Sequence, residues 1–190
     1  MSACLVIQTG KAMLTGSGTA ISSTINDQIY RLDESGVKLW HVDNMVIFCS
    51  GNMDYAYETM NHFVMLSNRN YEPTVSLKGS LFEQHINSTR GISVVHEDVS
   101  YLYHISPANN FIIETRKMES NADAVAIWSA GIKTAESADK AECYLVQGQT
   151  VNEVYQNVFD YISFESVGGE LAVFQMIRDE VNCMTNEDLG

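Results

Sequence analysis

Residues 2–18 constrain the fold most, because they contain two β-rich runs joined by a short turn. Thr9-Gly10-Lys11 separates the two runs, and glycine at such a position is typical of a tight hairpin. The second run ends at Gly16-Ser17-Gly18, a corner from which a side chain can be presented. The sequence therefore predicts an antiparallel pair that brings the start of the chain close to Ser17.

Further strands are predicted where β-branched and aromatic residues lie between turn residues. The run from Met45 to Cys49 is apolar throughout, which indicates a strand covered on both faces of its sheet. Residues 19–33 mix small polar with apolar residues, which suits a strand edge and a long connection, and no regular element is assigned there. The predicted strands are 37–42, 45–49, 91–96, 99–105, 111–117, 124–129 and 170–177, with a short one at Cys183 and Met184.

Four helices are predicted from apolar residues at helical spacing. The first begins near Asn52, the second covers about 75–87, and the third covers about 133–145. The fourth has the clearest start, because Thr150 and Glu153 form a capping box in which each satisfies a backbone donor beside the other.

The order of these elements is strands, two helices, strands, two helices and a final strand. Two stacked, mainly antiparallel sheets with a helix pair on each outer face would bury every apolar stripe. This arrangement is a four-layer α-β-β-α sandwich of the α+β class, formed by residues 1–190 as a single domain. The order alone also permits a two-layer α+β domain.

Charge and composition exclude several functions. The net charge of −13 disfavours nucleic acid and anionic lipid surfaces as partners. The longest apolar run, at Met45 to Cys49, is too short to span a membrane, and the first residues lack a signal-peptide pattern, so a cytoplasmic location is expected. The four cysteines are scattered, which predicts reduced thiols rather than disulfides.

No cofactor or metal is predicted. The five histidines show no metal-ligand spacing, either with one another or with the cysteines. Gly16-Ser17-Gly18 lacks the Gly-Lys-Thr continuation and the helix that a phosphate-binding loop requires.

Several motifs occur in an order that is similar to a known family. Gly16-Ser17-Gly18-Thr19-Ala20 looks like the Gly-Asp-Gly-Gln-Ala-Thr turn of HslV-type peptidases, which are relatives of proteasome β subunits. Lys38 in its strand, the buried strand after it and Ser50-Gly51 resemble the lysine strand and helix start of that family. Ser129-Ala130-Gly131 and Gly168-Gly169 resemble later family motifs. The likeness spans nearly the whole chain.

The resemblance implies the sandwich fold of N-terminal-nucleophile hydrolases and cleavage of amide bonds. In such enzymes the first residue of the mature chain supplies the nucleophile, and its own α-amine is the base. Ser2 takes this role once Met1 is removed, although an ungapped count back from Ser17 puts the family threonine on Met1. Lys38 is implied as the buried cation beside the nucleophile, and the Gly51 amide as the oxyanion donor.

Three further serines match family positions. Ser17 stands where the family has an aspartate that pairs with the lysine, so charge compensation has to come from elsewhere; Asp43 and Glu165 are the carboxylates near it in the pattern. Ser129 corresponds to a serine near the terminal amine, and Ser166 lies close to a family serine that precedes the Gly-Gly strand.

Each of these residues also has an ordinary structural interpretation. Ser2 is a common second residue, Lys38 fits an exposed lysine on an edge strand, and Ser129 fits a helix-capping residue. Three functions therefore remain open. They are a ring-forming peptidase that acts on peptides or proteins with an ATP-driven unfoldase, an inactive subunit of the same fold with a structural or binding role, and an amidase or acyltransferase for small amides.

Overall fold

The computed structural model describes residues 2–26, 28–33, 35–67, 89–131, 133–163, 168–178 and 180–184. Its strands form two five-stranded sheets and a separate two-stranded sheet. The first sheet has the order β10 (Val125–Gly131), β1 (Ala3–Thr9), β2 (Ala12–Gly18), β11 (Leu171–Ile177) and β12 (Glu180–Met184). The second has the order β5 (Leu39–Val42), β6 (Met45–Cys49), β7 (Arg90–His96), β8 (Val99–Ile105) and β9 (Glu114–Glu119).

The predicted first hairpin is confirmed as the pair β1 and β2. Their antiparallel register places Gln8 opposite Met13 at the turn and Cys4 opposite Ser17 at the open end. The beginning of the chain therefore lies beside the Gly-Ser-Gly corner. Every neighbouring pair of strands in both large sheets is antiparallel.

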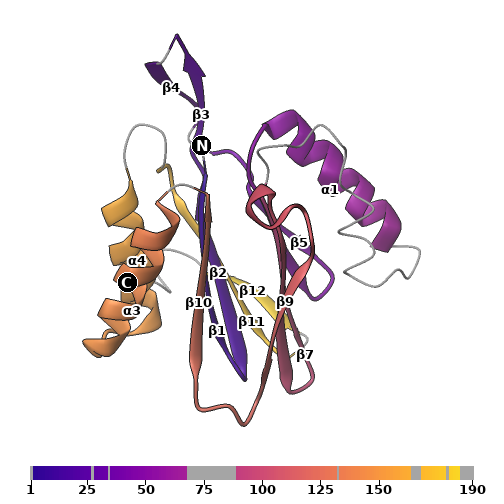
Figure 1. The fold of residues 1–190 in the computed structure, drawn as a ribbon, viewed down its shortest axis with the longest axis vertical. Coiled ribbons are helices and arrows are strands. Elements are labelled where there is room, and N and C mark those ends of the chain that lie inside the picture. The colour runs from indigo at the N-terminus through magenta and orange to yellow at the C-terminus, as the bar shows by residue number, and fades with distance from the viewer. Residues whose placement is uncertain are drawn as a thin grey trace.

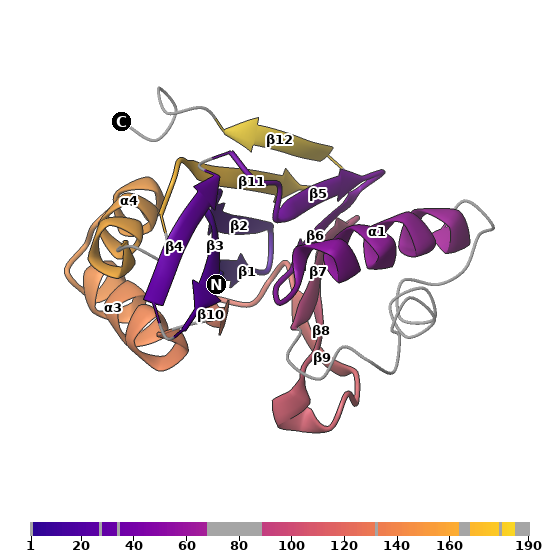
Figure 2. The ribbon, with the colours of Figure 1, turned by 90° about the horizontal axis from the view of Figure 1, so that it is seen from above.

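Helices cover the outer face of each sheet. Helices α3 (Thr134–Val146) and α4 (Val151–Ile162) lie against the first sheet, and α1 (Met53–Ser67) lies against the second (Figures 1 and 2). The two sheets face each other between these helices, so the predicted four-layer sandwich is confirmed. The predicted helix at 75–87 lies outside the described residues. In the part of the chain that the structure describes, no helix has the length and apolar character needed to cross a bilayer.

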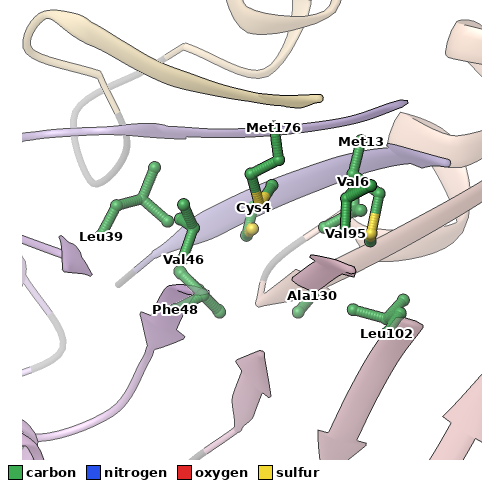
Figure 3. Close-up of a cluster of buried hydrophobic side chains, with 10 residues drawn as sticks. All are labelled: Cys4, Val6, Met13, Leu39, Val46, Phe48, Val95, Leu102, Ala130 and Met176. Carbon is green, nitrogen blue, oxygen red and sulfur yellow. The ribbon is translucent and has the colours of Figure 1, made fainter. Parts of the chain in front are cut away.

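The main core lies between the two sheets. Cys4, Val6 and Met13 project from the first sheet toward Val46 and Phe48 of the second (Figure 3). All residues of β6 are buried, as its uninterrupted apolar sequence predicts, because alternate side chains enter the inter-sheet core and the layer under α1. Burial of these two faces fixes β6 between both layers.

Buried polar side chains also join the two sheets. The Thr15 hydroxyl lies 2.8 Å from the Ser93 hydroxyl, and Gln8 Nε2 donates to the carbonyl and the hydroxyl oxygen of Ser100, at 3.1 and 3.0 Å. Unpaired polar groups at such positions would be costly to bury, so these bonds favour one alignment of the two sheets over others.

The predicted capping box starts α4. The Thr150 hydroxyl accepts from the Glu153 N–H at 3.3 Å, and the Glu153 carboxylate accepts from the Thr150 N–H at 2.7 Å. The apolar stripe that follows is buried against the first sheet at Val154, Tyr155 and Val158. Local sequence and packing therefore agree on where this helix begins and which face it buries.

The structure adds one hairpin to the expected elements and corrects one strand. No regular element was assigned to residues 19–33, and they contain the hairpin of β3 (Ile21–Ile25) and β4 (Gln28–Asp33), which projects from the body in Figure 1. Asn26 has a φ of 50°, a left-handed conformation that asparagine tolerates in turns. The strand expected at 111–117 begins only at Glu114, because Asn110 and Phe111 both have positive φ and turn the chain first.

Candidate active site

Ser2 and Ser17 meet at the open end of the first hairpin. Ser2 immediately precedes β1 and is buried. The Ser17 hydroxyl donates to the carbonyl of Ala3 at 2.8 Å, with the Gly18 carbonyl 3.2 Å away. Ser17 therefore holds the backbone that directly follows Ser2.

The glycines around Ser17 allow other elements to approach this corner. A Cβ on Gly16 would lie 2.5 Å from the Tyr155 ring, and one on Gly18 would lie 2.6 Å from the Gly168 carbonyl oxygen. Both distances are shorter than van der Waals contact. Glycine at positions 16 and 18 is thus favoured by close packing against α4 and against Gly168, in the segment between α4 and β11.

Lys38 is buried beside the same corner. The side chain is only 3% exposed, and its ammonium donates to the carbonyl of Ala20. The interpretation as an exposed lysine on an edge strand is therefore wrong. Lys38, Ser17 and Thr19 line one cavity of about 170 Å³, together with Phe174. The structure brings the lysine to the strand end that carries Ser17, as the family resemblance implies.

The expected sources of charge compensation fall elsewhere. Asp43 lies in the turn after β5, at the opposite end of that short strand from Lys38, and its side chain is exposed. Glu165 and Ser166 lie outside the described residues. Ser17 is neutral and directs its hydroxyl to Ala3. A buried ammonium needs compensating partners, and the Ala20 carbonyl supplies one of them.

Gly51 stands at the turn between β6 and α1. Its φ of 103° favours glycine, and the residue is exposed. Asn52 then caps the helix, since its side-chain oxygen accepts from the N–H groups of Asp54 and Tyr55 at 2.9 and 3.4 Å. The preceding Cys49 N–H donates to the carbonyl of Lys38 at 3.2 Å. This bond places Lys38 beside the end of β6, and the Gly51 turn begins at that same end.

Ser129 lies on β10, the strand that pairs with β1. In the ladder of β10 and β1 it is opposite Leu5, and its hydroxyl donates to the Thr134 carbonyl at 2.5 Å, at the start of α3. Gly131 is the residue opposite Ala3, and a Cβ there would lie 1.8 Å from the carbonyl oxygen of Ser2. Sequence reasoning gave Gly131 only as the end of a family-like motif and did not predict its contact with Ser2, although a glycine between a strand and a helix is a signal of close backbone approach.

Arg90 is a second residue that sequence reasoning missed. It is fully buried at the start of β7, opposite Cys49, and bonds to the carbonyl of Ser50 beside Gly51. Burial lowers the pKa of its guanidinium, and the nearby Cys49 acts in the opposite direction. An arginine at the start of a largely apolar strand was the available signal, because such a side chain is rarely buried without a specific role.

Cys4 and Cys49 are buried and do not supply an accessible thiolate at this site. Burial raises the pKa of Cys4 strongly, and burial raises the pKa of Cys49 to about 12 despite the opposing effect of Arg90. Both thiols therefore stay protonated at neutral pH. All four cysteines are free. Among the described residues, no group of histidine, cysteine and acidic side chains is arranged to hold a metal ion.

Comparisons with known proteins give a match in structure only. No protein-family model matches the chain, and no curated protein sequence does. The crystal structure of eukaryotic HslV from Trypanosoma brucei matches with a TM-score of 0.64 at 13% identity, over 93% of this chain and 99% of that chain. The Anbu (Gly-1) mutant from Hyphomicrobium sp. strain MC1 matches with a TM-score of 0.64 at 12% identity, over 99% of this chain and 89% of that chain.

Both matched proteins are N-terminal-nucleophile hydrolases of the proteasome type. The two matches cover 93% and 99% of this chain. The chain therefore has the proteasome-type fold of the N-terminal-nucleophile hydrolases.

Proposed function

We propose that this chain is a proteasome-like hydrolase that cleaves amide bonds in peptides, with Ser2 as its nucleophile after removal of Met1. The observation that carries the proposal is the buried Lys38 ammonium, directed at the Ala20 carbonyl beside the hairpin end where Ser2 lies. A buried cation is costly to maintain, and it is useful where a neighbouring hydroxyl has to lose a proton.

The proposed chemistry needs no histidine. An α-amine has a pKa of about 7.7–8.0, so part of it is neutral at cellular pH and can take the Ser2 hydroxyl proton. The Lys38 charge favours the alkoxide that attacks the substrate carbonyl. The Gly51 N–H then donates to the oxyanion of the tetrahedral intermediate. Ser17 holds the Ala3 backbone, and Ser129 and Ser166 assist in the roles that the family resemblance implies.

Substitution of Lys38 tests this proposal. Lys38→Met keeps the side chain's length and removes its charge, and it should lower hydrolysis of a fluorogenic peptide amide about a hundredfold or more. Lys11→Met is the matched control, because Lys11 is exposed at the opposite end of the hairpin. Equal rates in the two variants would contradict the proposal, as would an intact mass showing that an active chain retains Met1.

The assembly and location belong to the same proposal. HslV-like structures suggest a chain that forms oligomeric rings, and we extend this to a peptidase ring that receives substrates from an ATP-driven unfoldase in the cytoplasm. The net charge of −13 supports partners other than nucleic acid. Light scattering on untagged protein tests the ring, since a monomeric mass would contradict it.

A non-catalytic subunit of the same fold is the second candidate. Two observations favour it: the neutral Ser17 stands in place of an acid, and the Ser129 hydroxyl is engaged by the Thr134 carbonyl at the start of α3. This candidate predicts a stable ring that neither hydrolyses peptides nor reacts with a peptide boronate, even when Ser2 is the first residue.

A further inference from the structure

Arg90 joins three elements at the candidate site. Its Nη1 donates to the Ser50 carbonyl at 2.8 Å, and its Nη2 donates to the Thr59 hydroxyl on α1 at 3.3 Å. Nη1 also lies 3.3 Å from the Thr89 carbonyl. The guanidinium has a planar, fixed arrangement of donors, so the bond from Nη1 sets the position of the Ser50 carbonyl relative to β7, while Nη2 bonds to α1 separately.

The Ser50 carbonyl and the Gly51 N–H belong to one peptide group. The bond is trans, so the N–H points opposite to the carbonyl and away from Arg90. In the described part of the chain, no residue accepts a hydrogen bond from the Gly51 N–H, and Gly51 is exposed. The bond from Arg90 to the Ser50 carbonyl therefore directs the Gly51 N–H away from the protein, where it is available as a donor.

Ser50 is also held by hydrogen bonds to the backbone of Thr89. Its N–H donates to the Thr89 carbonyl at 3.0 Å, and its hydroxyl accepts from the Thr89 N–H at 3.1 Å. These bonds hold the N–H and the side chain of Ser50, whereas Arg90 holds the Ser50–Gly51 peptide group through its carbonyl. A cation bonded to the carbonyl also polarises the peptide, which makes its N–H a stronger donor.

Arg90 and Lys38 lie in one row across the second sheet. Cys49 pairs with Arg90 on one side, and its N–H donates to the Lys38 carbonyl on the other. The two buried cations therefore flank the same end of β6. One is beside the hairpin end that carries Ser2, and the other is behind the Gly51 turn.

We infer that Arg90 is a positioning residue that orients and polarises the Ser50–Gly51 peptide so that the Gly51 N–H can donate to a substrate oxyanion, an inference that rests on the hydrolase proposed above. The guanidinium acts through Gly51 and does not touch the substrate. Its removal should lower kcat and leave KM nearly unchanged, because the donor acts on charge that develops in the transition state.

The test compares Arg90→Met and Arg90→Lys with Thr59→Val. Thr59→Val removes the acceptor on α1 but leaves the bond from Arg90 to Ser50, so it controls for loss of stability. Arg90→Met should lower kcat about a hundredfold at similar KM. Arg90→Lys, which keeps the charge, should retain more of the rate, and Thr59→Val should stay close to wild type.

A second measurement does not depend on activity. In protein labelled with ¹⁵N-glycine, the Gly51 amide resonance should move in both Arg90 variants and stay in place in Thr59→Val. Should Arg90→Met fail to fold, Arg90→Lys carries the comparison. An unmoved Gly51 resonance in the Arg90 variants, or an equal movement in Thr59→Val, would overturn the inference. Wild-type protein that begins at Ser2 and forms no boronate adduct would refute the hydrolase, while the resonances still decide the role of Arg90.

Discussion

Single residues at the hairpin end show how much the site depends on close backbone contacts. Gly131 has a φ of 95° and leaves no room for a Cβ beside the Ser2 carbonyl. The sequence pattern predicted a strand at 124–129 followed by a helix at about 133–145. It could not show that residues so far apart in the chain touch, because that contact follows from the pairing of β1 with β10.

Gly131→Ala should destabilise the fold more than Gly148→Ala does. Both glycines have positive φ, so each alanine carries a similar strain of about 1 kcal/mol. Only the first adds a clash, since a Cβ on Gly148 would meet nothing within 4 Å. The free energies of unfolding from urea titrations measure the difference. Equal losses in the two variants would mean that the Ser2 backbone moves aside freely.

His104 should make the fold less stable at mildly acidic pH. Burial lowers its pKa, although the Glu114 carboxylate, 3.0 Å away, acts in the opposite direction; Arg116 lowers it further. The unfolded chain then binds more protons than the folded one, so stability falls as the pH drops through about 6.5. His104→Gln removes this group, and its free energy of unfolding should fall less between about pH 7.5 and 5.5. Parallel decreases in the two proteins would contradict this assignment.

At the scale of elements, α4 is attached to the hairpin by one buried hydroxyl. Tyr155 Oη lies 2.6 Å from the Leu14 carbonyl and 3.0 Å from the Leu5 carbonyl, and it accepts from the Ile7 N–H at 3.3 Å. The capping box and apolar stripe predicted the helix and its buried face. The attachment itself was not predictable, because it depends on Gly16 admitting the tyrosine ring.

Tyr155→Phe should therefore lower the free energy of unfolding by about 1–3 kcal/mol, because buried backbone groups lose their partner. Tyr161→Phe on the same helix is the control. Its hydroxyl makes a long, exposed contact of 3.4 Å with Glu136, so its removal should change little. Chemical denaturation of both variants checks this, and a Tyr155 variant as stable as wild type would refute the attachment.

For the whole molecule, the layers were predictable and the site was predictable only in part. The apolar strand at Met45–Cys49 and the helical stripes predicted two sheets with helices outside, since that arrangement buries them all. The projecting hairpin of β3 and β4 was missed, because its mixed polar and apolar residues carry no clear alternation. Arg90 was missed because its partners come from β6, α1 and β7, which only the folded chain brings together.

The central claim is that Ser2, as the first residue of the mature chain, is a nucleophile beside the buried Lys38 ammonium. The most direct test is the intact mass of untagged protein before and after incubation with a peptide boronate. We expect a chain without Met1 that gains the mass of one inhibitor, with Ser2→Ala and Lys38→Met gaining little. A wild-type chain that keeps Met1 would contradict Ser2 as the nucleophile, and so would equal labelling of the Ser2→Ala variant.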